Sequence, residues 1–212
     1  MKRIIYLLLL FVVTMTACNK ATYEPCKGDL LFVVGEESSE FSEAITKSTA
    51  HHEELKYDHV AIVDIVNDSV CVIEASSRGG VNVMPWPEFM ESAKMSNNCV
   101  GIVVKRVNVP IDVDEAIKIA RSHLGEEYDW SFRPDNDKMY CSELVYESYL
   151  DKEGLHIFNA DPMSFRDAEG NLPQFWVDLY SRLGEEVPEG VLGTNPTKMS
   201  QSPLLIEVWR FF

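Results

Sequence analysis

The residue with the clearest chemical potential is Cys141, within the stretch 139–146. A polar loop at 133–138 precedes it and an amphipathic stretch follows it, so the pattern predicts that the thiol lies at the N-terminus of a helix. Free N–H groups and the positive end of the helix dipole stabilise a thiolate there, and the thiolate is the nucleophilic form of cysteine. The alternative interpretation is a buried cysteine that only fills space in a core.

A nucleophilic cysteine needs a base, and a hairpin pattern upstream supplies a candidate. Two β-branched runs, 57–66 and 69–76, flank Asn67-Asp68, which predicts a two-residue turn between antiparallel strands. With that turn, His59 and Glu74 project from the same face of the hairpin, one diagonal step apart. The carboxylate can then reach the imidazole. A turn with an odd number of residues would place the two side chains on opposite faces.

The remaining positions on that face are apolar, so His59 and Glu74 need partners or a function. Burying such polar groups unpaired costs about 2–7 kcal/mol by transfer estimates. A purely structural His–Glu pair is the alternative to a catalytic one. If Glu74 does not orient the imidazole, Asp64 or a backbone carbonyl is left for that task.

Four strings in this order, 28–32, 58–63, 73–75 and 140–145, resemble the circularly permuted branch of the NlpC/P60 papain-like superfamily. The nearest group is the YiiX/YebB-like cysteine hydrolases. In the permuted branch the histidine and a polar residue precede the cysteine, as His59 and Glu74 precede Cys141 here. The match extends from about Gly28 to the C-terminus and includes 125–132 and 193–196. The resemblance implies an α+β, circularly permuted papain-like fold and a cysteine hydrolase.

In such an enzyme Cys141 attacks an acyl carbonyl, and His59 takes its proton and later delivers one to the leaving group. Glu74 holds the imidazole in the correct tautomer. The Cys141 backbone N–H is expected to stabilise the oxyanion. Tyr140 is a candidate second donor or substrate contact, with packing as the alternative. Asp58 is a candidate partner for a substrate ammonium, with a solvated strand end as the alternative.

This mechanism requires no metal and no cofactor. The sequence 51–54, His-His-Glu-Glu, is the only metal-like cluster, and its polar context favours a solvated loop or helix end. The resemblance favours an amide substrate in a peptidoglycan stem peptide or a released muropeptide. Acyl transfer or ester cleavage on lipids is a rival, and it predicts an exposed apolar groove near Cys141. A binding lipoprotein with a degenerate site is a rival of a different class.

The N-terminus predicts export. Lys2 and Arg3 precede the apolar run 4–13, and a small-residue cleavage site ends at Cys18, as in a bacterial lipoprotein signal. We therefore expect a signal peptide at 1–17, an acylated Cys18 with a tether over 18–27, and a hydrolase domain over 28–212. The apolar run is shorter than the roughly 20 residues of a membrane-spanning helix. A secreted protein without lipid is the alternative to a protein anchored in the periplasm or outer membrane.

Composition excludes one class of partner. The formal charge is −15, and no cluster of Lys and Arg is present to displace counterions from a polyanion, so nucleic acid is not an expected partner. Neither a repeat nor a linker divides the mature chain, which predicts one domain. Cys71 and Cys99 are expected in the core, and Cys141 is expected to be unpaired.

The elements that must position these side chains follow from hydrophobic periodicity. Besides the hairpin and the helix at Cys141, the sequence predicts a strand at 30–34 and a helix at 41–47 that can extend to 56. Further strands are expected at 81–85, 100–107 and 204–211, and further helices at 87–93, 111–124 and 172–183. The last helix has the stripe Phe175, Trp176, Leu179 and Leu183, interpreted as core. Antiparallel strands flanked by helices make an α+β domain.

Overall fold

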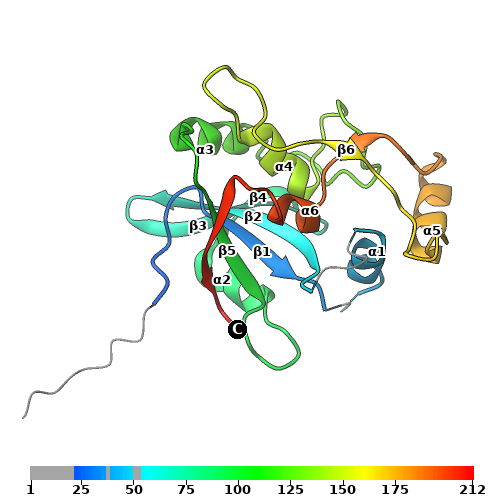
Figure 1. Ribbon diagram of the computed structural model, residues 1–212, viewed down its shortest axis with the longest axis horizontal. Helices are drawn as coiled ribbons and strands as arrows, with labels where there is room; N and C mark the ends of the chain where they lie inside the picture. Colours follow the sequence, from blue (N-terminus) through cyan, green and yellow to red (C-terminus); the bar gives the residue numbers. More distant parts are fainter. Residues whose placement is uncertain (1–21, 37–38, 50–53) are drawn as a thin grey trace, which may run out of the picture.

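The structure is a computed structural model that describes residues 22–212 except 37–38 and 50–53. Its centre is a six-stranded antiparallel sheet in the order β4-β3-β2-β1-β5-β8, with helices on both faces, as Figure 1 shows. The α+β class and the antiparallel sheet are therefore as predicted. None of the helices in the described residues is long and apolar enough to cross a membrane.

The strands of the main sheet are β1 (Leu30–Val34), β2 (Tyr57–Val66), β3 (Ser69–Ser76), β4 (Gly80–Pro85), β5 (Ile102–Val107) and β8 (Leu205–Arg210). A separate two-stranded ribbon pairs β6 (Asp161–Pro162) with β7 (Leu192–Gly193). The helices are α1 (Glu40–Thr49), α2 (Trp86–Ser92), α3 (Val113–Ser122), α4 (Cys141–Ser148), α5 (Gln174–Leu183) and α6 (Pro196–Ser200).

The β2–β3 hairpin has the predicted register. Asn67 and Asp68 both have positive φ, 49° and 61°, which is the backbone geometry of a two-residue turn that matches the twist of the flanking strands. Val66 pairs with Ser69, and the ladder continues in register to the pair of Ile62 with Ile73.

Two apolar cores cover the two faces of the sheet. The larger core joins sheet residues such as Phe32 and Ile73 to α1, α3, α4 and α5. The smaller core lies against α2 and includes Ala61, Val72 and Phe89. Figure 1 accordingly shows α2 on the opposite side of the sheet from α4.

Three expectations were wrong in detail. Helix α1 ends at Thr49, and the described residues Glu54 to Lys56 are not helical. Cys99 is exposed because it lies in the turn before β5, whose buried run starts only at Ile102. On α5, Leu183 is 40% exposed, while Tyr180 is buried in its place.

At Gly80 the edge of β4 packs closely against residues 125–128, which precede the loop before Cys141. Its φ is +62°, and a Cβ at this position would lie 2.1 Å from the Glu126 carbonyl oxygen. That same oxygen accepts a hydrogen bond from the Val81 N–H at 2.9 Å. The glycine therefore allows the 125–128 segment to pair with the edge of β4.

We expect Gly80→Ala to destabilise the protein more than Gly184→Ala. Both glycines have positive φ, but a Cβ at Gly184 meets no atom within 4 Å. Gly184→Ala should cost about 1 kcal/mol for the left-handed backbone alone. The clash at Gly80 should raise the cost to at least about 2 kcal/mol. Urea unfolding of both variants measures this, and equal losses would contradict the close approach to Glu126.

Candidate active site

Cys141 is the first residue of α4, as the sequence predicted. The N-cap residue Tyr140 has an extended backbone, and the Leu144 N–H donates to the Tyr140 carbonyl at 3.0 Å, so the helix begins at the cysteine. Cys141 is 4% exposed, and its side chain belongs to the larger core. The thiol thus lies where the unpaired N–H groups of a first helical turn converge.

His59 on β2 and Glu74 on β3 are in contact. The distance from His59 Nε2 to Glu74 Oε2 is 2.8 Å, as the predicted register requires. Glu74 is 5% exposed, and Asn82, its cross-strand partner on β4, also hydrogen-bonds to it. Because Nε2 is held by the carboxylate, Nδ1 is the ring nitrogen that remains for Cys141.

A β-bulge lies directly before His59. The partners of Val33 and Val34 on β2 are His59 and Tyr57, so Asp58 is an extra residue in the strand. Bulges next to active sites re-aim a neighbouring side chain. The Asp58 carboxylate accepts a hydrogen bond from the Ser42 hydroxyl of α1, which ties this bend to a helix.

The electrostatics of the three side chains are coupled. Burial disfavours a charged imidazole, but hydrogen bonding to Cys141 and Glu74, and their negative charge, outweigh it and raise the pKa of His59 well above 6.5. Burial opposes ionisation of Glu74 as well, but its hydrogen bond to His59 and the charge of that ring lower the pKa of Glu74. The arrangement therefore favours an imidazolium beside an ionised carboxylate.

Glu143 lies in the first turn of α4, two residues after the cysteine. Burial raises its pKa to about 8, although its Oε2 accepts a hydrogen bond from the Tyr140 N–H at 3.3 Å. A carboxyl that is mostly protonated at neutral pH caps the helix without placing a negative charge in the same helical turn as Cys141. Sequence reasoning missed this role, because the signal for it is burial rather than residue type.

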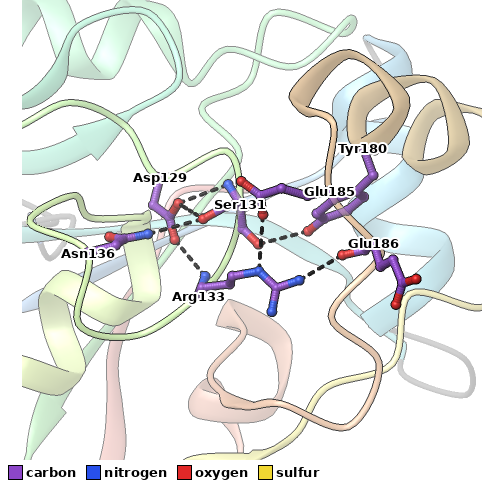
Figure 2. Close-up of polar contacts among 7 residues, drawn as sticks. All are labelled: Asp129, Ser131, Arg133, Asn136, Tyr180, Glu185 and Glu186. Atoms are coloured by element: carbon purple, nitrogen blue, oxygen red, sulfur yellow. Dashed lines mark hydrogen bonds and ion pairs between the residues drawn. The ribbon is translucent and has the colours of Figure 1, made fainter.

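The loop before α4 is organised by Asp129, which is fully buried. Figure 2 shows its carboxylate accepting hydrogen bonds from the Ser131 N–H, the Ser131 hydroxyl and the Arg133 N–H. The Tyr180 hydroxyl of α5 donates to the Ser131 carbonyl at 2.9 Å, and Arg133 reaches Glu185. These contacts fix the loop against α5 and thereby fix the approach to Cys141.

A second segment is attached to the start of α4 from the C-terminal side. The Thr194 N–H donates to the Tyr140 hydroxyl at 3.0 Å, and the Thr194 hydroxyl donates to the Ser142 hydroxyl at 2.9 Å. Tyr140 is 4% exposed, so it combines a packing role with a place next to Cys141. The segment 193–196 belonged to the family resemblance, but its sequence gave no sign of this contact.

A cavity of about 650 Å³ opens at Cys141. Tyr140, Asp58 and Ser142 also line it, while His59 and Glu74 do not. Its wall is formed by α1, the loop before α4, the segments around β6 and β7, and α6. Trp176, assigned to the core by its helical spacing, is buried and also forms part of this wall.

Other candidates lie away from this centre or outside the described residues. Asp64, the alternative orienting carboxylate, pairs instead with Arg121, whose Nε is 2.7 Å from it. The four described cysteines, Cys26, Cys71, Cys99 and Cys141, are free thiols. Cys18 and the residues 51–53 of the His-His-Glu-Glu sequence are not among the residues that the structure describes.

Comparisons with known proteins identify the fold. Residues 24–209 match the family described as permuted papain-like amidase enzyme, YaeF/YiiX, C92 family. The chain is 27% identical over 210 residues to the protein YiiX of Escherichia coli (strain K12), which covers 96% of this chain and 97% of that protein. It is also similar to a crystal structure of metalloprotein YiiX from Escherichia coli O157:H7, with a TM-score of 0.70 and 26% identity over 89% of this chain and 98% of the other.

The description of that structure as a metalloprotein raises the question of a metal centre. Within the described ranges of the present chain, no group of three or more His, Cys, Asp or Glu side chains is arranged to hold a metal ion. The donor set of these residues therefore does not fit a metal centre.

The family match over most of the chain, the similar solved structure and the antiparallel sheet lead to one conclusion: this chain belongs to the permuted papain-like amidase family of YaeF and YiiX.

Proposed function

We propose that the protein is a cysteine amidase in which Cys141 is the nucleophile, His59 the acid and base, and Glu74 the group that orients the imidazole. One observation carries the proposal. Glu74 holds Nε2 of His59 at 2.8 Å, and interaction of the same partly buried ring with the side chain of Cys141, at the start of α4, raises the pKa of His59. Membership in an amidase family supports the same reaction class.

The reaction balances with these three groups and one water. The Cys141 thiol proton passes to Nδ1 of His59, and the thiolate attacks the amide carbon to form a tetrahedral oxyanion. The C–N bond then breaks as His59 returns the proton to the leaving nitrogen, which leaves a thioester on Cys141. Water deprotonated by His59 hydrolyses the thioester and restores the thiol. Glu74 stabilises the imidazolium in both halves.

The oxyanion requires donors at the start of α4. The Cys141 backbone N–H lies in the first helical turn and is our candidate. The Tyr140 hydroxyl already accepts from Thr194, but its own hydrogen is free to serve as a second donor or substrate contact. Asp58 lines the same cavity and is the candidate partner for a substrate ammonium, although Ser42 already engages it.

Two substrate classes suit this chemistry. The resemblance to cell-wall hydrolases supports an amide in a peptidoglycan stem peptide or a released muropeptide. A second candidate, an amide or ester of a long acyl chain, is favoured by the apolar side chains around the cavity at Cys141. A binding protein with a degenerate site is disfavoured, because a cysteine, a histidine and a carboxylate meet in one coupled cluster.

We place the enzyme at the cell envelope on the basis of its N-terminal sequence. The basic start, the apolar run and Cys18 form a lipoprotein signal, and a lipid on Cys18 would anchor the domain through residues 18–27. The anchor would determine where the enzyme works without entering the chemistry at Cys141.

Thiol reactivity tests the nucleophile. Cys141 should be alkylated by iodoacetamide faster than the exposed Cys26 and Cys99 at mildly acidic pH, because reactivity follows the thiolate and not exposure alone. His59→Ala should slow labelling of Cys141 by at least about tenfold, since the imidazolium that stabilises the thiolate is lost. Peptide mapping by mass spectrometry provides the rates. His123→Ala is the control, and equal slow labelling of the four described cysteines would indicate a structural Cys141.

The pH profile tests Glu74. His59 must be protonated to release the amine, so the alkaline limb of kcat/KM should lie well above 6.5. Glu74→Gln should shift that limb to lower pH, because Glu74 raises the pKa of His59, and should lower kcat by about 10²–10⁴-fold. Glu126→Gln is the matched control, since it alters a second His–Glu contact, His123 with Glu126, at the end of α3. An unchanged profile in Glu74→Gln would remove Glu74 from the site.

Cell fractionation tests the location. Cys18→Ser should abolish acylation and release a soluble protein that keeps its amidase activity, because the proposed lipid attaches to that thiol. Fractions from cells expressing each form are assayed for the protein and for activity. Sedimentation of the variant with membranes would contradict the lipoprotein proposal. A soluble, folded but inactive variant would indicate that the substrate is itself a membrane lipid.

A further inference from the structure

The residues just before β1 pack against the domain. The Tyr23 hydroxyl donates to the Asp29 carboxylate at 2.7 Å, and Arg106 of β5 pairs with the same buried carboxylate at 2.6 Å. The Cys26 N–H also donates to Asp29, at 3.0 Å. The chain is therefore attached to the domain from Tyr23 onward.

Tyr23 is the centre of an aromatic cluster. Its ring centroid lies 5.9 Å from that of Trp86 at the start of α2, 6.4 Å from that of Trp209 on β8 and 5.7 Å from that of Phe211. These four rings are partly exposed and pack against the smaller core, and the next residue, Phe212, is 42% exposed. We call these five residues the aromatic patch.

The proposed lipid anchor is close to the aromatic patch along the chain. Only residues 19–22 separate Cys18 from Tyr23. A fully extended chain of that length reaches at most about 18 Å. A lipid on Cys18 would therefore hold Tyr23 within that distance of the membrane interface, and the side of the domain that carries the patch would face the bilayer.

The composition of the patch suits a phospholipid surface. Tyrosine and tryptophan combine an apolar ring with a hydrogen-bonding group, and such rings concentrate where acyl chains meet headgroups. The exposed carboxylates of Glu24 and Glu88 lie next to Tyr23 and Trp86 in sequence and would be repelled by anionic headgroups. The patch consequently fits a zwitterionic surface better than an anionic one.

The cavity at Cys141 lies on the other side of the sheet. Cys141 belongs to the larger core, whereas the aromatic patch packs against the smaller core. Figure 1 shows α4 and α2 on opposite sides of the sheet. A bilayer in contact with the patch would therefore leave the cavity open to the aqueous phase.

We propose that the aromatic patch rests on the zwitterionic surface of the bilayer that holds the lipid anchor, and that this contact turns Cys141 away from that bilayer. The inference rests on the lipoprotein part of the proposed function and adds an orientation to it. Anchor and patch are two separate contacts, so the domain does not rotate freely about its tether. Substrate then reaches Cys141 from the water.

Quenching of tryptophan fluorescence by brominated lipid tests the orientation. Of the four tryptophans, Trp86 and Trp209 belong to the patch, while Trp130 and Trp176 pack with the larger core. Full-length acylated protein is placed in phosphatidylcholine vesicles with bromine on the acyl chains near the headgroups, and its emission is compared with that in unbrominated vesicles. The double variant Trp130→Phe/Trp176→Phe should lose most of its emission, whereas Trp86→Phe/Trp209→Phe should keep nearly all of it.

A substitution in the patch makes the test specific. Phe212→Glu in the otherwise unchanged protein should reduce the quenching, because it places a carboxylate at the lipid contact. Leu155→Glu is the matched control, since Leu155 is 64% exposed in the loop after α4 and does not belong to the patch. Urea unfolding of all variants separates misfolding from loss of the contact.

The outcomes distinguish the orientation from the anchor on which it rests. Acylated protein in which the patch tryptophans are not quenched, or are quenched less than Trp130 and Trp176, would overturn the orientation and leave the lipoprotein proposal standing. A mass spectrum without an acyl group on Cys18 would overturn both. A Cys18→Ser protein that is dimeric in light scattering, and monomeric once Phe212→Glu is added, would assign the patch to a second copy of the chain instead.

Discussion

The register between β2 and β3 decides whether the proposed catalytic groups come together, because His59 and Glu74 meet only in that register. A slip of one residue would turn one of the two side chains to the other face of the sheet. The register is fixed by Asn67 and Asp68, whose positive φ values close the hairpin in two residues. A turn 8 residues from the histidine along the chain therefore controls the distance of 2.8 Å between the His59 imidazole and the Glu74 carboxylate.

Holding these groups in a buried site has an energetic cost. Each buried ion loses several kcal/mol of hydration, which only close pairing and hydrogen bonding can offset. His59 is paired on one side with Glu74 and on the other with Cys141, and Glu74 is held in addition by Asn82. The bulge at Asp58 shifts the strand directly before the imidazole, and the bond from Ser42 connects this irregularity to α1. The hydrogen bond to α1 thus stabilises the strand where the bulge interrupts the regular ladder.

The same segments that position Cys141 also shape the cavity beside it. The loop fixed by Asp129 contributes Phe132 to the wall, and Tyr180 of α5 holds that loop in place (Figure 2). Thr194 joins the segment after β7 to the Tyr140 and Ser142 hydroxyls. A change in the cavity wall therefore has a direct structural route to Cys141.

The local features of this protein could be predicted from the order of its amino acids. Period-two alternation and the Asn67-Asp68 turn predicted the hairpin and the His59–Glu74 contact, and the polar loop before an amphipathic run predicted that α4 begins at Cys141. These features depend on residues close in the chain, so the hydrophobic pattern and the turn geometry are enough to predict them. Contacts between distant segments account for the approach of Cys141 to His59, the raised pKa of Glu143 and the wall of the cavity beside Cys141. These features arise where segments distant in sequence meet. Burial, which no local sequence pattern reports, raises the pKa of Glu143 and sets the packing of the cavity wall. For the same reason, Cys99 and Leu183 were predicted to be buried, but in the structure both are exposed.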